Sequence, residues 1–110
     1  MEFIATPTFS RKRKKLMNDE DFELFKQELA ERPGTGAPIV GTGGLRKIRF
    51  TLPGRGKSGG GRVIYFWLTS RGKIILLDVY AKSSKADITT AEERRLAKIR
   101  DEVIKNLDET

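Results

Sequence analysis

Three segments in the middle of the chain have the patterns of β-strands and are separated by short loops. Residues 45–52 alternate between apolar and polar side chains, which is typical of a strand with one buried face. Residues 63–68 and 73–80 are apolar at almost every position, which indicates strands buried on both faces near the centre of a sheet. Because the connections between the segments are short, we expect neighbouring strands to run antiparallel.

Helices are predicted before and after these strands. Residues 19–31 begin with three acids, which favour the positive end of a helix dipole, and their apolar side chains fall on one face. Pro33 follows and ends the helix. Near the C-terminus, Thr90 and Glu93 match a capping box, and apolar residues then recur at helical spacing up to Leu107. We therefore expect an α+β fold, a small antiparallel sheet with helices packed on one face and the other face available for a site.

The length of the chain predicts a single domain over residues 1–110, because so short a chain cannot build a second hydrophobic core. The absence of cysteine excludes disulfides and thiolate zinc sites and fits a reducing, cytoplasmic compartment. Apolar runs are short, residues 74–77 being typical, so we expect no transmembrane helix and no association with membranes. The basic run at residues 11–15 follows the first apolar residues instead of preceding an apolar stretch, which argues against a signal peptide.

Histidine is also absent from the sequence. Acid–base catalysis near neutral pH would therefore have to use Lys, Arg, Tyr, Asp or Glu side chains. We expect neither a metal ion nor an organic cofactor.

Positive charge is concentrated in the middle of the chain. The net charge is +7, but residues 1–31 and 78–110 together carry two more acids than bases. Residues 32–77 contain nine bases and no acid. A stretch this one-sided repels itself unless it faces an anion, and nucleic acid is the natural candidate. The nine bases are Arg32, Arg46, Lys47, Arg49, Arg55, Lys57, Arg62, Arg71 and Lys73.

A glycine-rich segment, residues 53–61, contains strings that resemble nucleotide-binding motifs. Residues 54–59 match Gly-x-Gly-x-x-Gly, and residues 56–58 resemble the end of a phosphate-binding P-loop. Both motifs require a helix N-terminus immediately afterwards, and here a strand is predicted instead. We interpret the segment as a hairpin loop whose Arg55 and Lys57 are able to contact phosphate.

The polar face of the first predicted strand is a better candidate site. Lys47 and Arg49 are two residues apart and so point to the same side of the sheet, and Arg62 opens the neighbouring strand. Such a cluster is able to hold a phosphodiester and to stabilise the charge that develops on it during cleavage. A solvated sheet face, or RNA binding without turnover, explains the same pattern, since charge alone does not indicate catalysis.

Three blocks of sequence resemble the RelE/HigB family of toxins in their order and spacing. They are GTGGLRKIR at residues 41–49, GRGKSGGGRVIYFWL at residues 54–68 and DVYAKSSKADIT at residues 78–89. With the flanking predicted helices, the resemblance covers about residues 19–107. It implies an antiparallel sheet carrying helices, an antitoxin encoded in the same operon, and metal-independent cleavage of mRNA in the ribosomal A site, which inhibits translation.

The resemblance also implies a mechanism, in which the ribose 2′-hydroxyl attacks the adjacent phosphate and leaves a 2′,3′-cyclic phosphate. Lys47, Arg49 and Arg62 match the basic catalytic cluster of the family. We assign proton transfer to Lys47, because arginine does not deprotonate in proteins. Arg49 and Arg62 would hold the phosphate.

The third block departs from the family pattern. The family often supplies an arginine and a tyrosine here, whereas this chain has lysines at Lys82 and Lys85 and a threonine, Thr89, where a tyrosine might be expected. Tyr80, Lys82 and Lys85 are the available substitutes. Asp87 is interpreted as a local loop-capping residue and not as a base. The second proton carrier is therefore not identified from the sequence.

These considerations give a set of expected sites. Catalysis is assigned to Lys47, Arg49, Arg62, Tyr80 and Lys82. RNA binding is assigned to Arg46, Arg55, Lys57, Arg71, Lys73 and Lys85.

The expected partners are the ribosome with its mRNA and a cognate antitoxin. We expect the antitoxin to bear a helix-turn-helix or a disordered acidic arm, and operator DNA to be contacted only through it. Two other functions fit the same sequence. One is a non-catalytic, gyrase-inhibiting toxin of the related ParE type, against which the basic cluster argues, and the other is a plain RNA-binding module.

Two further features have two interpretations each. The basic run at residues 11–15 is either a helix or arm that contacts ribosomal RNA, or a solvated surface. The aromatic residues Tyr65, Phe66 and Trp67 lie in an apolar strand, which favours core packing over base stacking.

Overall fold

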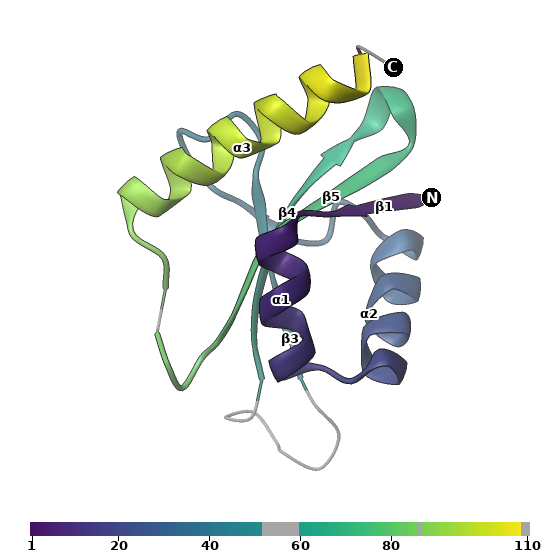
Figure 1. Ribbon diagram of the computed structural model, residues 1–110, viewed down its shortest axis with the longest axis vertical. Coiled ribbons are helices and arrows are strands. Elements are labelled where there is room, and N and C mark those ends of the chain that lie inside the picture. The colour runs from purple at the N-terminus through teal and green to yellow at the C-terminus, as the bar shows by residue number, and fades with distance from the viewer. Residues whose placement is uncertain (52–59, 86, 109–110) are drawn as a thin grey trace.

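The computed structural model describes residues 1–51, 60–85 and 87–108. Within these residues the chain forms one five-stranded sheet in the order β1-β5-β4-β3-β2 (Figure 1). β1 pairs with β5 in parallel, and the other neighbouring strands are antiparallel. The strands are β1 (Glu2–Ala5), β2 (Ala37–Pro38), β3 (Arg46–Phe50), β4 (Gly61–Leu68) and β5 (Lys73–Ala81).

The three predicted strands are confirmed as β3, β4 and β5, and they form the predicted antiparallel meander. The sequence did not predict β1 and β2, which occupy the two edges of the sheet. Both are short, with four and two residues, so neither contains enough alternation to be recognised. β1 also pairs with a strand about 70 residues away, which no local pattern can indicate.

Three helices accompany the sheet: α1 (Pro7–Leu16), α2 (Asp19–Glu31) and α3 (Thr90–Asp108). α2 has the predicted bounds. Side chains cap the first two helices, since Thr6 Oγ accepts a hydrogen bond from the Phe9 N–H at 3.2 Å and Asn18 Oδ1 accepts one from the Asp21 N–H at 2.8 Å. None of the described helices is both long enough and apolar enough to cross a membrane.

α3 begins with a capping box one residue earlier than the sequence predicted. The Glu92 N–H donates to Thr89 Oγ1 at 3.1 Å, and the Thr89 N–H donates to Glu92 Oε1 at 3.0 Å. The prediction of Thr90 and Glu93 is therefore wrong by one position. Both pairs fit the sequence rule, and only the actual start of the helix distinguishes them.

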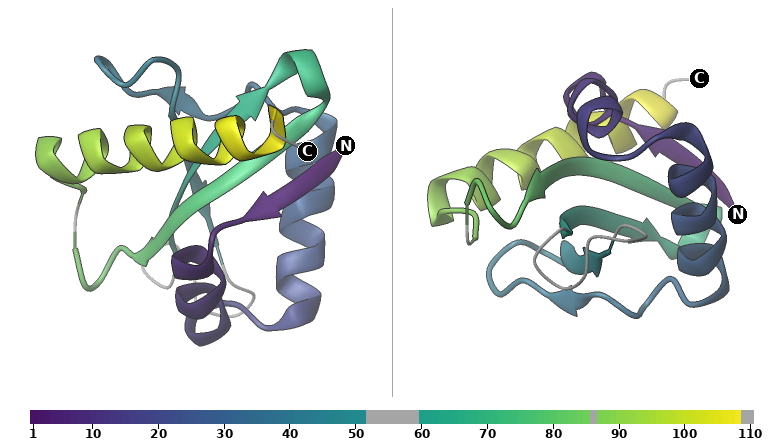
Figure 2. Two further views of the ribbon diagram at one scale, coloured as in Figure 1. Left: turned by 45° about the horizontal axis from the view of Figure 1, so that its top comes forward. Right: turned by 90° about the horizontal axis from the view of Figure 1, so that it is seen from below.

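Both faces of the sheet carry helices, in contrast to the predicted packing on one face. α1 and α2 cover one face through a core that includes Phe9, Phe25 and Leu29, whereas Leu96 of α3 packs into a second core on the opposite face (Figure 2). The physical reason is that β4 and β5 carry apolar side chains on both faces, so helices must pack on each face to bury them. The predicted α+β class with a small antiparallel sheet is confirmed.

A β-bulge interrupts the pairing between β4 and β5. Tyr65 pairs with Leu76, but the preceding residue, Ile64, pairs with Asp78. Leu77 is therefore an extra residue on β5, and it shifts the alternation of the strand by one position.

The bulge decides which face of the sheet carries Tyr80. Leu76 packs in the core under α1 and α2, so strict alternation would place Tyr80, four residues later, on that same side. Tyr80 instead belongs to the core on the α3 side, and Val79 takes the position under α1 and α2. Because Leu77 is left out of the pairing, Tyr80 stays on the face that carries the predicted basic cluster.

Candidate active site

Strand register aligns three of the predicted catalytic residues in a row across the sheet. Arg49 of β3 lies directly opposite Arg62 of β4, and Arg62 lies opposite Tyr80 of β5. Neighbouring strands are about 4.8 Å apart, so the three side chains start close together on the α3 side of the sheet. Like charges directly opposite each other destabilise a sheet, and a bound anion would relieve the repulsion between the two arginines.

Lys47 and Tyr80 meet at a carboxylate. The Lys47 ammonium contacts both oxygens of Asp87, at 2.9 and 3.1 Å, and the Tyr80 hydroxyl donates to Asp87 Oδ1 at 3.2 Å. Asp87 therefore connects β3 to β5 through their side chains. We call Lys47, Arg49, Arg62, Tyr80 and Asp87 the active-site cluster.

The protonation states within the cluster follow from its contacts. Burial, followed by the nearby Asp87 carboxylate, raises the pKa of Tyr80 above its usual value near 10. Tyr80 therefore keeps its proton near neutral pH and acts as a hydrogen-bond donor. The hydrogen bond from Lys47 lowers the pKa of Asp87, so this carboxylate is ionised in the free protein.

Two cations of the cluster and one beside it have donors available for a ligand. Arg49 is exposed, and its side chain makes no hydrogen bond or ion pair with any residue that the structure describes. Arg62 is half-buried, and its guanidinium has only a long 3.5 Å contact with the Gly61 carbonyl among the described residues. Lys82, at the end of β5, is exposed and has no side-chain partner in the described part of the chain. An anion at this end of the sheet would find unpaired N–H groups.

Asp87 is the member of the cluster that sequence reasoning missed. The predicted capping role exists, because Asp87 Oδ1 accepts a hydrogen bond from the Ile88 N–H at 2.9 Å. The same carboxylate also contacts Lys47, which is 40 residues away in the chain. Its position next to a basic block was a weak signal, and only the tertiary structure identifies its partners.

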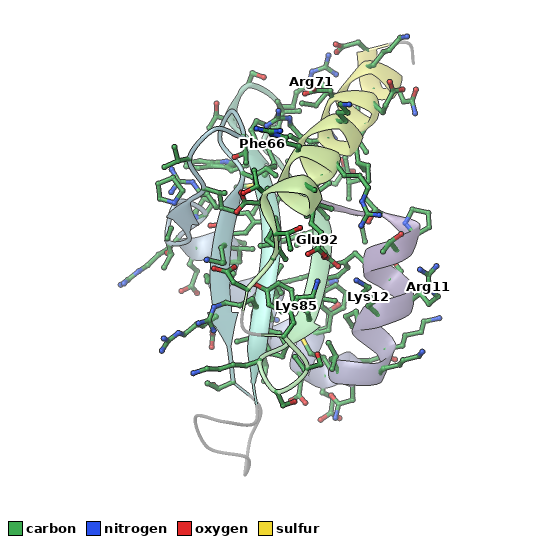
Figure 3. The ribbon with its side chains drawn as sticks, turned by 90° about the vertical axis from the view of Figure 1, so that its left-hand side faces the viewer. Arg11, Lys12, Phe66, Arg71, Lys85 and Glu92 are labelled. Atoms are coloured by element: carbon green, nitrogen blue, oxygen red, sulfur yellow. The ribbon has the colours of Figure 1, made fainter. Side chains whose placement is uncertain are left out.

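Lys85 and Thr89, the other unusual positions of the third block, contribute to the start of α3. The Lys85 ammonium lies 2.5 Å from Glu92 Oε2 and 5.5 Å from the centre of the Tyr80 ring (Figure 3). The hydrogen bond from Lys85 is the main reason that the pKa of Glu92 falls from its ordinary 4.5 to about 2. Thr89 caps α3, so the position where the family would offer a tyrosine serves to begin the helix.

Arg46 lies on the opposite side of the sheet from the cluster. Its guanidinium donates to the carbonyls of Gly34 and Gly36 at 3.1 and 2.7 Å, which fixes the segment before β2. Tyr65 on the neighbouring strand is fully buried and donates to the Pro33 carbonyl at 2.7 Å. Tyr65 therefore packs in the core, as predicted, and Arg46 has a structural partner.

Arg71 and Lys73 are not brought to the cluster either. Both lie at the far end of the β4–β5 hairpin, where they form ion pairs with Asp108 and Glu2, respectively. Lys73 pairs with the last residue of β4, which places it about 20 Å along the strand from Arg62. These two cations are too far away to contact the same phosphate as the cluster.

Arg55 and Lys57 lie within residues 52–59, outside the described residues, so their contact with RNA stays a prediction. The glycine-rich nucleotide-binding strings lie there too. The element that follows this segment is a strand, β4, and not the helix that those motifs require.

The cluster lies on an open part of the sheet. A hollow of about 790 Å³ lies elsewhere, between β1, α1 and α3, and none of the cluster residues lines it. A polymer backbone binds along a surface, so the cluster needs no deep cavity to receive one.

Fold and site together define a class of small, basic α+β domains that present cations from adjacent strands of an antiparallel sheet. Residues 4–110 match the sequence model of the family described as the RelE toxin of the RelE/RelB toxin–antitoxin system. The chain belongs to the RelE toxin family.

A solved structure confirms the fold of this family. The chain is similar to a double mutant of the Escherichia coli toxin RelE in the free state, with a TM-score of 0.59 over 90% of this chain and 95% of that one. The two sequences are 17% identical over the match, so the likeness concerns the fold.

Proposed function

We propose that this protein cleaves mRNA in the ribosomal A site and so inhibits translation, as the toxin of a toxin–antitoxin pair. The observation that carries the proposal is the row formed by Arg49, Arg62 and Tyr80, with Lys47 and Asp87 beside it. Membership of the RelE toxin family supports the toxin role and implies a cognate antitoxin.

In the proposed reaction the two arginines hold the scissile phosphate. Arg49 and Arg62 lie opposite each other on adjacent strands, so their guanidinium groups can approach one phosphate from two sides. Charge builds up on the phosphate oxygens as the 2′-hydroxyl attacks, and fixed cations stabilise that charge. Lys82 would contact the RNA strand next to the cluster.

Lys47 and Asp87 supply the proton transfers. As the 2′-oxygen bonds to phosphorus, Asp87 accepts the 2′-hydroxyl proton, and Lys47 donates a proton to the departing 5′-oxygen. A proton then passes from Asp87 to Lys47, which are 2.9 Å apart, and the pair returns to its charged state. Tyr80 orients the carboxylate through its hydroxyl. The products are a 2′,3′-cyclic phosphate and a free 5′-hydroxyl.

A cationic face of this kind must be covered by a partner when the toxin is inhibited. We infer that a cognate antitoxin binds the protein in the cytoplasm through a disordered acidic arm or a helix-turn-helix. In the complex, only the antitoxin would contact operator DNA. Acidic side chains would complement Arg49, Arg62 and Lys82.

Primer extension on a message under translation tests the proposal. Wild-type protein should leave cuts on translating ribosomes, and Arg62→Ala should cut roughly 100 to 1000 times more slowly, the usual effect of losing one donor to a developing charge. An intact message with wild-type protein would refute the nuclease. A DNA supercoiling assay run beside it identifies the alternative, because a gyrase inhibitor would block supercoiling and leave the message uncut.

A further inference from the structure

Asp78 is a buried acid in the middle of a strand that is otherwise apolar or aromatic. Every residue of β5 from Ile74 to Tyr80 is buried, and Asp78 is the one charged residue among them, with a side chain that is only 4% exposed. A carboxylate at such a position is unfavourable unless it is paired and hydrogen-bonded. In the proposed reaction Asp87, and not Asp78, accepts the proton. The presence of a charge at Asp78 therefore has to be explained separately.

The carboxylate has one partner within β5 and one in α1. Asp78 Oδ1 accepts a hydrogen bond from the Val79 N–H at 2.9 Å, and the Lys12 ammonium contacts the same oxygen at 2.9 Å (Figure 3). β1 pairs with β5 only as far as Leu76. Beyond that residue, Lys12 of α1 supplies the contact at Asp78, so a helix side chain supports β5 where the pairing with β1 has ended.

Thr6 attaches the start of α1 to the same stretch of β5. The Thr6 N–H donates to the Leu76 carbonyl at 3.1 Å, and the Thr6 hydroxyl donates to the Leu77 carbonyl at 3.3 Å. Leu77 is the residue that is left out of the pairing between β4 and β5. Thr6 and Lys12 thus hold two consecutive residues at the bulge, and we call Thr6, Lys12 and Asp78 the bulge clamp.

The bulge determines which face of the sheet carries Asp78. Leu77 packs in the core on the α3 side, and Asp78 lies opposite Ile64, which packs in the same core. Two consecutive side chains of β5 therefore lie on one face, which a regular strand does not allow. The position of Asp78 is a direct consequence of the bulged pairing.

A regular pairing would move the carboxylate into the other core. If Leu77 paired with Ile64, Asp78 would lie opposite Val63, on the face under α1 and α2. In the structure Val79 occupies that position, and it is fully buried among apolar side chains. Placing a carboxylate there would bury a charge in an apolar core, which is strongly unfavourable. The charge of Asp78 thus disfavours the regular pairing.

We propose that Asp78 is a positioning residue, whose buried charge selects the bulged pairing and so keeps Tyr80 opposite Arg62. Thr6 and Lys12, the other members of the bulge clamp, stabilise this arrangement from α1. Bulges next to active sites commonly re-aim a side chain. The inference rests on the proposed function, in which Tyr80 orients the carboxylate that accepts the proton, and it requires no contact between Asp78 and the message.

Asp78→Val tests the proposal, because valine has no charge to bury on either face. The pairing is read by NMR from contacts between backbone protons of facing residues, since Arg62 faces Tyr80 in the bulged pairing and would face Val79 in the regular one. We expect the variant to show the contact between Arg62 and Val79. Single-turnover cleavage on programmed ribosomes should slow at least about tenfold, as the penalty that excluded the regular pairing is gone. Affinity for ribosomes should stay within about threefold, since no cation is lost.

A conservative variant and a control accompany this measurement. Asp78→Asn can still accept both hydrogen bonds and remains unfavourable in an apolar core, so it should keep the bulged pairing and cleave within about threefold of wild type. Ile74→Val removes a methylene group from a fully buried residue of the same strand, before the bulge. It should lower the melting temperature without changing the pairing or the cleavage rate, which separates lost positioning from lost stability.

Lys12→Met is a second variant, which keeps the test valid if Asp78→Val does not fold. The Lys12 side chain is 41% exposed, so its loss leaves the core intact. It removes a contact that only the bulged pairing is expected to make. The contact between Arg62 and Tyr80 should weaken, and cleavage should slow in parallel.

The outcomes separate this inference from the proposed function. If wild-type protein does not cleave, the proposed function fails, and the NMR contacts still decide whether Asp78 selects the pairing. If Asp78→Val and Lys12→Met both keep the full contact between Arg62 and Tyr80, the inference is overturned and the proposed function stands. Equal slowing of Asp78→Val and Asp78→Asn with this contact intact would also overturn it, because the charge would then act on the reaction and not on the pairing.

Discussion

Replacing Asp87 by asparagine should separate chemistry from stability in this protein. The amide has the shape of the carboxylate and can still accept the Ile88 N–H and the Tyr80 hydroxyl, but it cannot accept a proton from the 2′-hydroxyl. Loss of a positioned proton acceptor typically slows a reaction 100- to 10,000-fold. We expect a decrease in this range in single-turnover cleavage on programmed ribosomes.

The cost in stability should be small. The side chain of Asp87 is 54% exposed and that of Lys47 is 28% exposed, so their ion pair is partly screened by water. Pairs of this kind contribute about 0.2–1 kcal/mol, which corresponds to a fall in melting temperature of at most about 8 °C. Thermal unfolding monitored by circular dichroism measures the shift directly.

Glu92→Gln is the matched control for this experiment. Glu92 also forms an ion pair with a lysine, Lys85, close to the cluster, but it does not contact Lys47 or Tyr80 among the described residues. Its variant loses the same charge and should cleave within threefold of wild type. The proposed proton cycle is refuted if Asp87→Asn retains more than a tenth of the wild-type rate, or if both variants slow equally.

Three further predictions concern the support around the site. Thr89→Ala removes the cap of α3 and should lower the free energy of unfolding by about 1 kcal/mol in urea titrations while cleavage stays within twofold, whereas a large loss of cleavage without destabilisation would assign Thr89 to the chemistry. Gly61→Ala would put a Cβ atom 2.1 Å from the Tyr80 carbonyl oxygen, so the strands must separate, and we expect a loss of about 3 kcal/mol or more; an unchanged midpoint would contradict the β4–β5 register. Glu92 has a pKa of about 2 in the folded protein against an ordinary 4.5, so it stabilises the fold above pH 4.5 and this contribution disappears as the pH falls towards 2. Stability measured over this range should fall less steeply in Glu92→Gln, and identical slopes would argue against the Lys85 contact.

Local pattern was sufficient to predict the centre of the fold. α2 and β3 show the helical and alternating spacing of apolar residues, and β4 and β5 are continuous apolar runs bounded by turns, which are the signals that a sequence provides. α1 lacks such a signal, because Phe9 is its only fully buried residue and five of its ten positions are bases. Its N-terminal cap at Thr6 followed by Pro7 was the available indication of a helix start.

The basic part of the site was predictable for a similar reason. Alternation puts Lys47 and Arg49 on one side of β3, and the short connection to β4 keeps Arg62 near them. The acidic partner was not predictable, since the contact between Asp87 and Lys47 depends on the path of the segment after β5. The location of Tyr80 was not predictable either, because it depends on a bulge that no residue type in β5 indicates.

That bulge makes the active site sensitive to the pairing of β5 as well as to its composition. Leu77 has no partner of its own on β4, since Tyr65 pairs with Leu76 and Ile64 pairs with Asp78. Deleting Leu77 would remove the bulge and leave a regular alternation from Leu76 to Tyr80, so Tyr80 would stay opposite Arg62. Pairing Leu77 with β4 would instead move every later residue of β5 by one position, so that Val79 would lie opposite Arg62 and Tyr80 would turn to the side of α1 and α2. The place of Tyr80 in the site thus depends on one residue that stays outside the pairing.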